Sequence, residues 1–559
     1  MPSLLDGLLV DAVIATISHH IWFRQYEPTS WGLIFMTTST ITLPVVYYTR
    51  PFLGSIVAAF LLTNAVYFGA LLTSIVAYRL SPFHPLWNVP GPTLCKVSKV
   101  WMMWIAYKGG LHRYCKEAHD VYGPVVRIGP NEISIIDKDL FPAILGPNGM
   151  PKGPVWDSRR IVTSRDYKNH KSFHAVRNLK VHAEFRKPWN KAFSKGPMKD
   201  YQEILLGRAT DLVKRLEKRC GEGKEGTIED MARWLNLFAF DFMGEMVFSE
   251  TFNVMDKPDV SGAWEIFERG LIFPSIAQHI PWIAPLTHLF PSFAKDSKDF
   301  HIFAAAQARA RAKFSSESLQ RDLFYHLLNF TEHEPDVSPL PFIMSNSVLA
   351  IAAGADTAAT GLGSAVFYLL ANPRWLDKVN EELDTLCGEL RLLRGDIPPF
   401  EKLASLQVLN AVINESLRLL PPFLTQLQRA PATRSGGKQL GSLFVPEGTA
   451  VQVPPYAVHR SSTYFSPSPN EFRPQRWLFE HQEEAFDRGA FIPFSMGPAN
   501  CVGRQLAMDE MRVVVALLAR NFEMEFEEGY DVRRWEWEMA DRFLAVKGVL
   551  PVRLRRKTE

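Results

Sequence analysis

The sequence lacks a cysteine framework. Only five of its 559 residues are cysteine (Cys95, Cys115, Cys220, Cys387 and Cys501), which is an odd number, and no two of them form a CxxC pair. A set of paired disulfides and a structural zinc site are therefore disfavoured, and a reducing environment fits the main body. Each cysteine has to be considered on its own.

The sequence also lacks a charge excess and a nucleotide-binding fingerprint. Lys and Arg number 62 against 59 Asp and Glu, and 47% of the residues are hydrophobic. This ordinary globular mixture argues against a nucleic-acid-binding protein and against a disordered chain. No GxGxxG motif follows a strand pattern, no phosphate-binding loop occurs, and no cysteine cluster fits an iron–sulfur centre.

Charged residues are missing from long runs near the N-terminus. Residues 52–78 contain no acid or base, and as a helix they reach roughly 40 Å, more than the roughly 30 Å core of a bilayer. This run predicts a transmembrane helix, and residues 31–49, which include Pro44, are a second candidate. Residues 4–23 contain Asp6 and Asp11 and predict an interfacial or imperfect span. A cleaved signal peptide is less favoured, because a basic start and a small-residue cleavage site are missing. We expect a membrane anchor over residues 1–80 with one to three transmembrane helices, the alternative being buried core helices.

A proline-rich segment separates this region from the rest of the chain. Residues 81–92 (SPFHPLWNVPGP) cannot continue a helix and predict a stiff hinge over residues 81–95. Lys96, Lys99 and Lys108 follow it, which places the body on the cytoplasmic side by the positive-inside rule. We find no second linker, so residues 96–559 are expected to form one large domain.

The body has mainly helical patterns with a minor strand signal. Apolar residues recur at helical spacing in residues 181–194, 201–218, 341–371, 375–389, 405–420 and 502–521. Strand patterns cluster in residues 125–136 and 442–453, where Pro446, Glu447 and Gly448 predict a hairpin turn. Residues 270–294 are uncharged but contain four prolines, which predicts short helices at a membrane surface or around an apolar entrance.

One cysteine stands in a position that suits chemistry. Residues 491–503 (FIPFSMGPANCVG) are rich in turn residues and lead Cys501 to a helix predicted to start near Val502. A helix N-terminus stabilises an anionic sulfur, so we expect the Cys501 thiol to be pushed toward the thiolate. Gly497 allows a tight turn, Gly503 removes bulk, and Phe494 can pack against the sulfur. An isolated cysteine before a helix is more often a buried structural residue.

The spacing of Phe494, Gly497, Cys501 and Gly503 resembles the FxxGxRxCxG haem-ligand loop of the cytochrome P450 family. The sequence as a whole is similar to a membrane-bound, fungal-like member. The resemblance implies the mainly α fold of that family with a minor β-sheet region, preceded by transmembrane helices. It also implies haem b, with Cys501 as the axial ligand of the iron. Ala499 stands where the family has Arg or His, so one contact to a haem propionate is missing.

An acid and a base three residues apart match a second family motif. Glu415 and Arg418 lie on one face of the helix predicted over residues 405–420, where such a pair is commonly a solvated surface bridge. The resemblance instead identifies them as the family's ExxR motif, which Arg476 completes as a buried structural triad. Its implied role is to shape the haem-side scaffold.

The long apolar helix predicted over residues 341–371 contains AGADT. Asp356 is its only charged residue from 345 to 370, and Gly354 is expected to loosen the helix beside the Asp356 carboxylate and the Thr357 hydroxyl. A chance surface acid is the alternative. The resemblance implies an oxygen-binding groove, in which Thr357 donates a hydrogen bond to oxygen and Asp356 relays protons.

Basic residues and the segment after the ExxR helix complete the expected site. By resemblance, Arg186 and Arg429, with His182 and possibly Trp189, contact haem propionates, and His459 is a weaker candidate. Lys187, Lys191 and Lys195 are expected to face an acidic redox partner. The expected substrate contacts are Ala353, Phe423, Leu424 and Thr425, together with Thr357.

The resemblance implies a monooxygenase that uses O2 and electrons from NADPH through a separate cytochrome P450 reductase, possibly with cytochrome b5. The expected location is the membrane of the endoplasmic reticulum. The catalytic domain is expected to lie in the cytosol and to contact lipid. A lipophilic small molecule is the expected substrate, and fungal secondary metabolism such as terpenoid oxidation is the first assignment. Hydroxylation of xenobiotic or aromatic compounds is the alternative, followed by a reductase-independent isomerase or dehydratase.

Overall fold

The computed structural model is mainly helical with small sheets, as the sequence predicts. It describes residues 3–24, 31–158, 173–221, 225–256, 262–280, 283, 290–313, 321–331, 339–393, 395–425, 427–478 and 486–557. The helices are α1 (Leu4–Ser18), α2 (Trp31–Leu53), α3 (Ile56–Leu80), α4 (Thr93–Val97), α5 (Val100–Tyr107), α6 (Leu111–Tyr122), α7 (Phe141–Leu145), α8 (Val155–Ser158), α9 (Leu179–Ala192), α10 (Lys195–Cys220), α11 (Met231–Phe248), α12 (Ala263–Ala277), α14 (Lys295–Lys313), α15 (Leu323–Thr331), α16 (Pro339–Ala371), α17 (Pro373–Leu390), α18 (Phe400–Ser405), α19 (Gln407–Leu419), α20 (Pro455–His459), α21 (Arg504–Asn521) and α22 (Arg533–Glu538).

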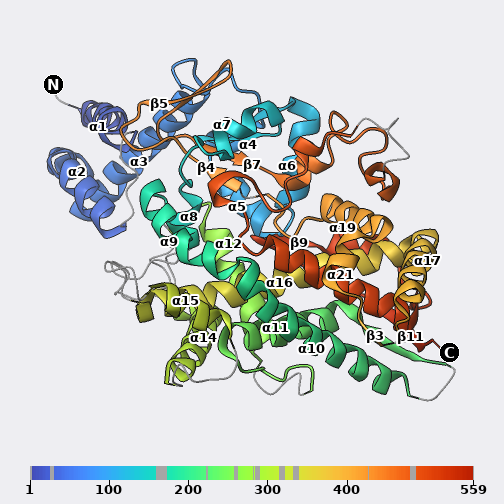
Figure 1. Cartoon of the computed structure of the whole chain (residues 1–559). Coiled ribbons are helices and arrows are strands. Elements are labelled where there is room, and N and C mark those ends of the chain that lie inside the picture. The colour runs from blue at the N-terminus through green and yellow to red at the C-terminus, as the bar shows by residue number, and fades with distance from the viewer. Residues whose placement is uncertain are drawn as a thin grey trace.

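The first three helices lie together at one edge of the molecule (Figure 1). Leu4–Phe23 and Ile56–Leu80 are long and apolar enough to cross a membrane; Leu349–Ala371 is too, but it is mostly buried inside the body. Hydroxyl and imidazole groups join α1 to α3, because the Ser18 and Tyr67 oxygens are 2.7 Å apart and His19 Nδ1 is 2.8 Å from Ser74 Oγ. The three N-terminal helices therefore form one packed unit.

The proline-rich hinge is folded onto the body. Residues 81–92 form turns, and Leu86 and Val89 are buried in a cluster with residues of the body. The guanidinium of Arg127, which is buried, donates to the Arg79 carbonyl oxygen at 3.1 Å, and Arg79 donates to the Val97 carbonyl oxygen at 2.6 Å. The end of α3 is thereby tied to the first strand and helix of the body.

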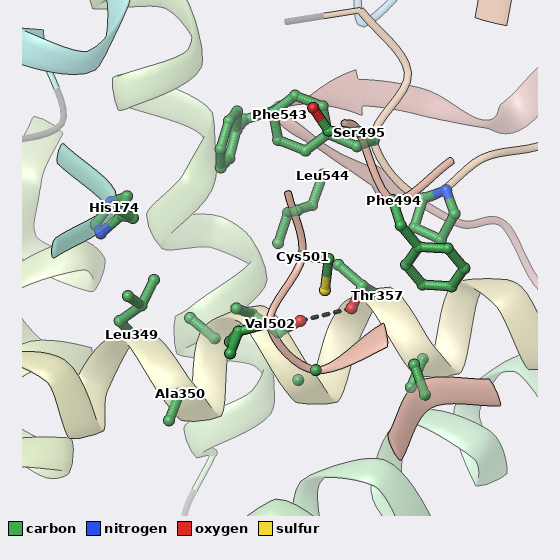
Figure 2. A pocket seen from close by; sticks show the side chains of 18 of the residues that line it. His174, Leu349, Ala350, Thr357, Phe494, Ser495, Cys501, Val502, Phe543 and Leu544 are labelled. Atoms are coloured by element: carbon green, nitrogen blue, oxygen red, sulfur yellow. Dashed lines mark hydrogen bonds between the residues drawn. The ribbon is translucent and has the colours of Figure 1, made fainter. Parts of the chain in front are cut away.

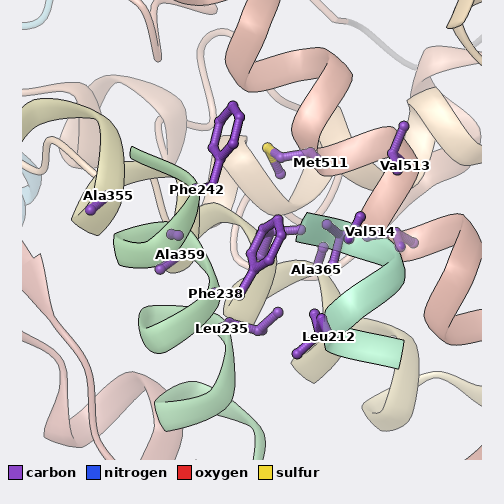
Figure 3. Packing of buried hydrophobic residues seen from close by; sticks show 14 of the residues in the cluster. Leu212, Leu235, Phe238, Phe242, Ala355, Ala359, Ala365, Met511, Val513 and Val514 are labelled. Carbon is purple, nitrogen blue, oxygen red and sulfur yellow. The ribbon is translucent and has the colours of Figure 1, made fainter. Parts of the chain in front are cut away.

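The core of the body surrounds α16. This helix packs against α11 through phenylalanines, including Phe238 and Phe242, and against α21 through aliphatic side chains, as Figure 3 shows; α10 covers α11 and α21. A Cβ at Gly354 would lie 2.4 Å from the Met243 sulfur, so this glycine lets α11 and α16 approach closely. The helix runs without interruption through Gly354, and the loosened turn expected there from the sequence does not occur.

The strands form four small sheets. The largest has the order β1-β2-β7-β4, with β2 and β7 parallel and Ile133 paired with Val451. The strands are β1 (Val125–Gly129), β2 (Glu132–Ile135), β3 (Thr227–Asp230), β4 (Leu427–Arg429), β5 (Gly437–Leu440), β6 (Leu443–Pro446), β7 (Ala450–Val453), β8 (Phe522–Phe526), β9 (Ala540–Arg542), β10 (Leu544–Val546) and β11 (Pro551–Arg556).

The hairpin predicted around Pro446 and Gly448 is wrong. The turn exists and Gly448 has a φ of 83°, but β6 pairs with β5, whereas β7 enters the larger sheet beside β2 and β4. All four residues of β7 are buried, whereas β6 exposes Phe444. β7 is buried along its whole length, as an inner strand between β2 and β4, whereas β6 pairs only with β5 among the described strands.

Candidate functional site

A cavity of about 540 Å³ lies beside α16. It is lined by α9, α12, α16, the residues after α19, the loop before α21 and the turn between β9 and β10. The Cys501 sulfur and the Thr357 hydroxyl face the same space in Figure 2. Its volume is that of a typical small-molecule site, and its wall is mainly apolar.

The loop that presents Cys501 is held by a tight turn. The Cys501 backbone N–H donates to the Phe494 carbonyl oxygen at 3.0 Å. Gly497 has a φ of 70°, and a Cβ there would lie 2.1 Å from the Leu145 carbonyl oxygen. Gly503 caps α21, which begins at Arg504 rather than near Val502, and its nearest neighbouring side-chain atom is 3.7 Å from an added Cβ. Glycine is therefore required by the fold at 497, whereas at 503 an added Cβ would make an ordinary van der Waals contact.

The helix-start N–H expected to favour a thiolate at Cys501 is present, but burial opposes it. Burial raises the pKa of the Cys501 thiol, although the Gly503 N–H and the Arg186 and Arg504 charges oppose that effect. The sulfur is accessible from the cavity but lies deep in the protein. A coordinating metal ion deprotonates a thiol directly, so an iron bound to this sulfur would hold it as the thiolate.

Two buried guanidinium groups line the cavity without an acidic partner among the described residues. Arg186 donates to neutral oxygens, the carbonyl of Asn500 at 2.7 Å and the side chains of Asn500 and Asn190 at 3.0 and 2.9 Å. Arg429 donates only to the Gln428 carbonyl oxygen at 3.1 Å, and burial lowers its pKa to about 10. These guanidiniums, with the buried Lys152 in the same wall, gather positive charge that calls for an anionic ligand.

Two ring nitrogens in this wall also have no hydrogen-bond partner in the described part of the chain. They are His182 Nε2 and Trp189 Nε1, both on α9 and both buried. Burial and the nearby cations lower the pKa of His182 to about 3, so the ring is neutral. A thiol that can bind iron, two guanidiniums and two orphaned ring nitrogens fit a haem with its propionates, whereas an apolar ligand would leave them unsatisfied.

Thr357 lines the cavity, but the neighbouring Asp356 does not. The Thr357 hydroxyl donates to the Ala353 carbonyl oxygen at 2.5 Å (Figure 2). Asp356 lies on another side of α16, where its carboxylate accepts from the Lys547 ammonium group at 2.9 Å. Both side chains are 1% exposed, and Lys547 also donates to Thr360 at 3.0 Å. The structure therefore separates the two groups that were expected to share one groove.

The ExxR pair and Arg476 are brought together in a buried cluster. Arg418 makes two hydrogen bonds of 2.8 Å to the Glu415 carboxylate, and Arg476 donates to it at 3.2 Å. The Trp477 indole also donates to Glu415, at 2.9 Å. Arg418 reaches the carbonyl oxygens of His459, Pro469 and Glu471, which ties α19 to the segment before the cysteine loop.

The expected substrate contacts separate into two groups. Ala353 and Phe423 line the cavity, whereas Leu424 and Thr425 are fully buried outside it, so the expectation for these two is wrong. Thr425 instead donates to the Asp541 carboxylate at 2.6 Å. His459 also lies outside the cavity wall, where its Nε2 accepts from the Ile492 N–H at 2.9 Å.

Sequence reasoning missed several residues of this site. Glu510 lines the cavity, its Oε1 has no partner in the described chain, and burial raises its pKa well above the usual value. Lys152 and Trp156 come from a segment with no helical or strand pattern, and Phe543 from a one-residue turn. Glu510 lies in the first half of α21, between Asp509 and Arg512, where neighbouring charges conceal it in the sequence.

The other expected surfaces are placed in part. Lys187, Lys191 and Lys195 are exposed at α9 and the start of α10, whereas Arg186 points inward. Residues 281–282 and 284–289 of the expected entrance lie outside the described residues. Its described part contributes Gly270, Leu271, Pro274, Ser275 and Gln278 to the cavity wall.

Comparison with known proteins gives one consistent family. The family description "Cytochrome P450" matches residues 90–544. Cytochrome P450 67 of Uromyces fabae is 31% identical over 95% of this chain and 96% of its own length. Tryprostatin B 6-hydroxylase of Neosartorya fischeri is 30% identical over the full length of both chains, and the cytochrome P450 monooxygenase notG' of Aspergillus versicolor is 27% identical over 98% of each.

Proposed function

The chain belongs to the cytochrome P450 family, and on that basis we propose that it oxidises a lipophilic small molecule of fungal secondary metabolism. It inserts one oxygen atom from O2 into a C–H bond and is a membrane-anchored monooxygenase. The observation that carries this proposal is the Cys501 sulfur in an apolar cavity that also holds the guanidiniums of Arg186 and Arg429.

Members of this family use a haem with a thiolate ligand and electrons from a reductase. When bound, haem supplies the iron that activates O2. In this chain Cys501 would be the ligand of the iron, and Arg186, Arg429 and His182 would hold the propionates. The turn at Gly497 fixes the cysteine loop, and the Phe494 carbonyl oxygen accepts a hydrogen bond from the Cys501 N–H. Gly503 has no side chain that would narrow the cavity beside Cys501.

Thr357 and Asp356 are the residues proposed to manage protons. The Thr357 hydroxyl stands in the cavity wall and can donate at Oγ1 when it leaves the Ala353 carbonyl oxygen. The Asp356 carboxylate can turn toward the cavity only if its ion pair with Lys547 breaks. While the pair is intact, the carboxylate stays on the side of α16 away from the cavity. Lys547 thereby sets the position of the acid, while Glu415, Arg418 and Arg476 keep the scaffold in place.

The exposed lysines Lys187, Lys191 and Lys195 support docking of an acidic electron donor. NADPH–cytochrome P450 reductase is the proposed donor, with cytochrome b5 as a possible second. The apolar helices α1 and α3 support anchoring in a membrane over residues 1–80, with residues 81–95 as the connection and 96–559 as the catalytic domain. We place the protein in the endoplasmic reticulum with that domain in the cytosol, because Lys96, Lys99 and Lys108 follow the anchor.

The substrate class is supported by the names of relatives and by the cavity wall. Two relatives bear the name tryprostatin B 6-hydroxylase and others are named fungal monooxygenases, which supports secondary metabolism but not terpenoids in particular. The alternative of aromatic-compound hydroxylation is favoured by the ring-lined wall of the cavity, where Trp156, Phe423 and Phe543 meet. A reductase-independent isomerase or dehydratase has less use for Asp356 and Thr357.

The test is reconstitution of the purified protein with a reductase. The reduced protein is expected to give the carbon monoxide spectrum of a thiolate-ligated haem, and substrate is expected to raise reductase-dependent NADPH consumption. Cys501→Ala removes the sulfur and should abolish both. Turnover by Cys501→Ala without a thiolate spectrum would overturn the mechanism, and turnover without reductase would favour the isomerase reading.

A further inference from the structure

Three aromatic side chains from distant parts of the chain meet in one corner of the cavity wall. Trp156 lies on α8, Phe423 follows α19, and Phe543 forms the turn between β9 and β10. The Trp156 and Phe423 rings are parallel within 6°, with centroids 6.5 Å apart. Phe543 is perpendicular to both, at 4.5 Å from Phe423 and 5.8 Å from Trp156. We call these three residues the aromatic corner.

Phe543 is held in a conformation that a side chain rarely adopts. Its φ is 83°, in the left-handed region that favours glycine. Strain of this kind persists where the surroundings impose it, and it clusters at ligand sites. A glycine would form the same turn without strain but would leave the corner without its perpendicular ring.

Buried hydrogen bonds impose this conformation. The Phe543 N–H donates to Asp541 Oδ1 at 3.1 Å, and the Thr425 hydroxyl donates to Asp541 Oδ2 at 2.6 Å. Asp541 and Thr425 are 1% and 0% exposed. The next residue, Arg542, donates to the carbonyl oxygens of Ala106 and Tyr107 on α5. The turn is fixed from two sides, so the ring of Phe543 is set before any ligand arrives.

We propose that the aromatic corner receives a flat aromatic ring of the substrate, and that Asp541 is the positioning residue that fixes it. This rests on the proposed monooxygenase function and names the substrate class of the same cavity. Two parallel rings and one perpendicular ring offer both stacking and edge-to-face contacts to a fourth ring. A saturated ring of the same size gains burial in this corner but not those contacts.

The size of the effect follows from the energy of aromatic pairs. Each such pair adds about 0.5 to 1.5 kcal/mol beyond the burial of area, which converts to about two- to twelvefold in affinity. A cyclohexyl group is more hydrophobic than a phenyl group, so burial alone favours the saturated ring. Tighter binding of the phenyl probe therefore indicates aromatic contacts in the aromatic corner rather than the general hydrophobicity of the cavity.

The experiment uses the purified holoenzyme and matched probes. N-(ω-phenylalkyl)imidazoles and N-(ω-cyclohexylalkyl)imidazoles with spacers of increasing length are titrated against the haem absorption band, which shifts when the imidazole binds. At the best spacer we expect the phenyl probe to bind at least fivefold more tightly than its cyclohexyl partner. Equal or tighter binding of the cyclohexyl probe at every spacer overturns the proposal.

Variants locate the preference. In Phe543→Gly, which relieves the backbone strain while removing the ring, the phenyl-to-cyclohexyl affinity ratio is expected to fall to about two or less, and Phe543→Leu should give the same result. Phe300→Leu is the matched control, because Phe300 lines the cavity on α14 and packs on Phe267, outside the corner. Its ratio should stay near the wild-type value. An unchanged ratio in Phe543→Gly, or an equal loss in Phe300→Leu, contradicts the proposal.

The positioning role of Asp541 has a separate readout. Asp541→Asn and Thr425→Val are expected to lower the same ratio at least twofold while the carbon monoxide spectrum stays that of the wild type. A wild-type ratio in both variants removes Asp541 from the proposal. Failure of the proposed function itself is distinct, because a protein without the thiolate carbon monoxide spectrum fails before any titration.

Discussion

At the scale of single residues, the pairing of Asp356 with Lys547 changes how the acid on α16 is understood. The carboxylate is 1% exposed, and so is the ammonium group that it accepts from at 2.9 Å. Such a pair contributes little net stability when it is intact but costs much when one partner is removed. Its role is therefore tested by comparing single and double replacements.

Asp356→Asn and Lys547→Met are each expected to lower the free energy of unfolding by about 3 to 5 kcal/mol, because each leaves one buried charge. The double variant Asp356→Asn/Lys547→Met should be closer to wild type in thermal unfolding. If Asp356 also relays protons, the double variant regains stability but diverts NADPH electrons to hydrogen peroxide. Wild-type coupling in the double variant would limit the pair to a structural role.

Glu268 on α12 faces this pair and gives it a pH dependence. Burial, followed by repulsion from Asp356, raises the pKa of Glu268 from 4.5 to about 7, and Glu265 adds to the rise while Lys547 opposes it. Between these two values the folded state binds more protons than the unfolded state, so stability falls as the pH rises.

Glu268→Gln removes that dependence. We expect the wild type to lose about 3 kcal/mol relative to the variant as the pH rises from 4.5 to above 7. Chemical unfolding of both proteins across this range measures the difference. Parallel profiles would show that Glu268 titrates normally.

At the scale of elements, the cysteine loop depends on a single backbone conformation. Gly497→Ala introduces a Cβ 2.1 Å from the Leu145 carbonyl oxygen at a φ of 70°. Both features oppose a side chain, so we expect a large loss of haem content and a lower unfolding temperature.

Gly503→Ala is the matched control for the loop, because the nearest neighbouring atom is 3.7 Å from the added Cβ. The apoprotein of this variant should unfold near the wild-type temperature. An equal destabilisation of both variants would show that the loop tolerates no Cβ at all, rather than being limited at Gly497.

Helices were predictable from the sequence, but the partners of short strands were not. The pattern of residues 181–194 and 405–420 gives α9 and α19 to within two residues, because helical spacing is a local property. The turn at Gly448 was also visible, yet it separates two sheets, since β7 finds β2 more than three hundred residues earlier in the chain. Pairing over such a distance leaves no local signal.

The site was predictable where a motif fixes it. Cys501, Arg186 and Arg429 do line one cavity, whereas Leu424 and Thr425, one and two residues beyond Phe423, turn away from it. A motif gives the position of a loop but not which of its successive side chains point inward. The Asp356–Lys547 ion pair could likewise not be predicted from a sequence pattern, because its partners are 191 residues apart.

At the scale of the whole molecule, the anchor and the body are joined by hydrogen bonds as well as by chain. A truncation that starts at Arg79 removes α1, α2 and nearly all of α3 but keeps the contacts of Arg79 with Arg127 and Val97. We expect this protein to keep the carbon monoxide spectrum and to be released from membranes by alkaline carbonate, which leaves the full-length protein in the pellet.

A truncation that starts after Val97 is the comparison, because it also removes the Arg79 side chain and the buried Leu86 and Val89. It should lose haem at a lower temperature than the first truncation. Retention of the first truncation in carbonate-washed membranes would contradict the assignment of α1 to α3 as the anchor.

The bonds between Arg79 and Arg127 also have a mechanical meaning. A flexible linker would let the catalytic body rotate relative to the N-terminal helices. Here the last turn of α3 is hydrogen-bonded to the body, so the helix and the body rotate together. Each residue inserted into α3 would turn the body by about 100° around the axis of that helix. The length of α3 thus fixes the rotation of the body about that helix, and a helix that replaced α3 would have to end at the same angle around its axis.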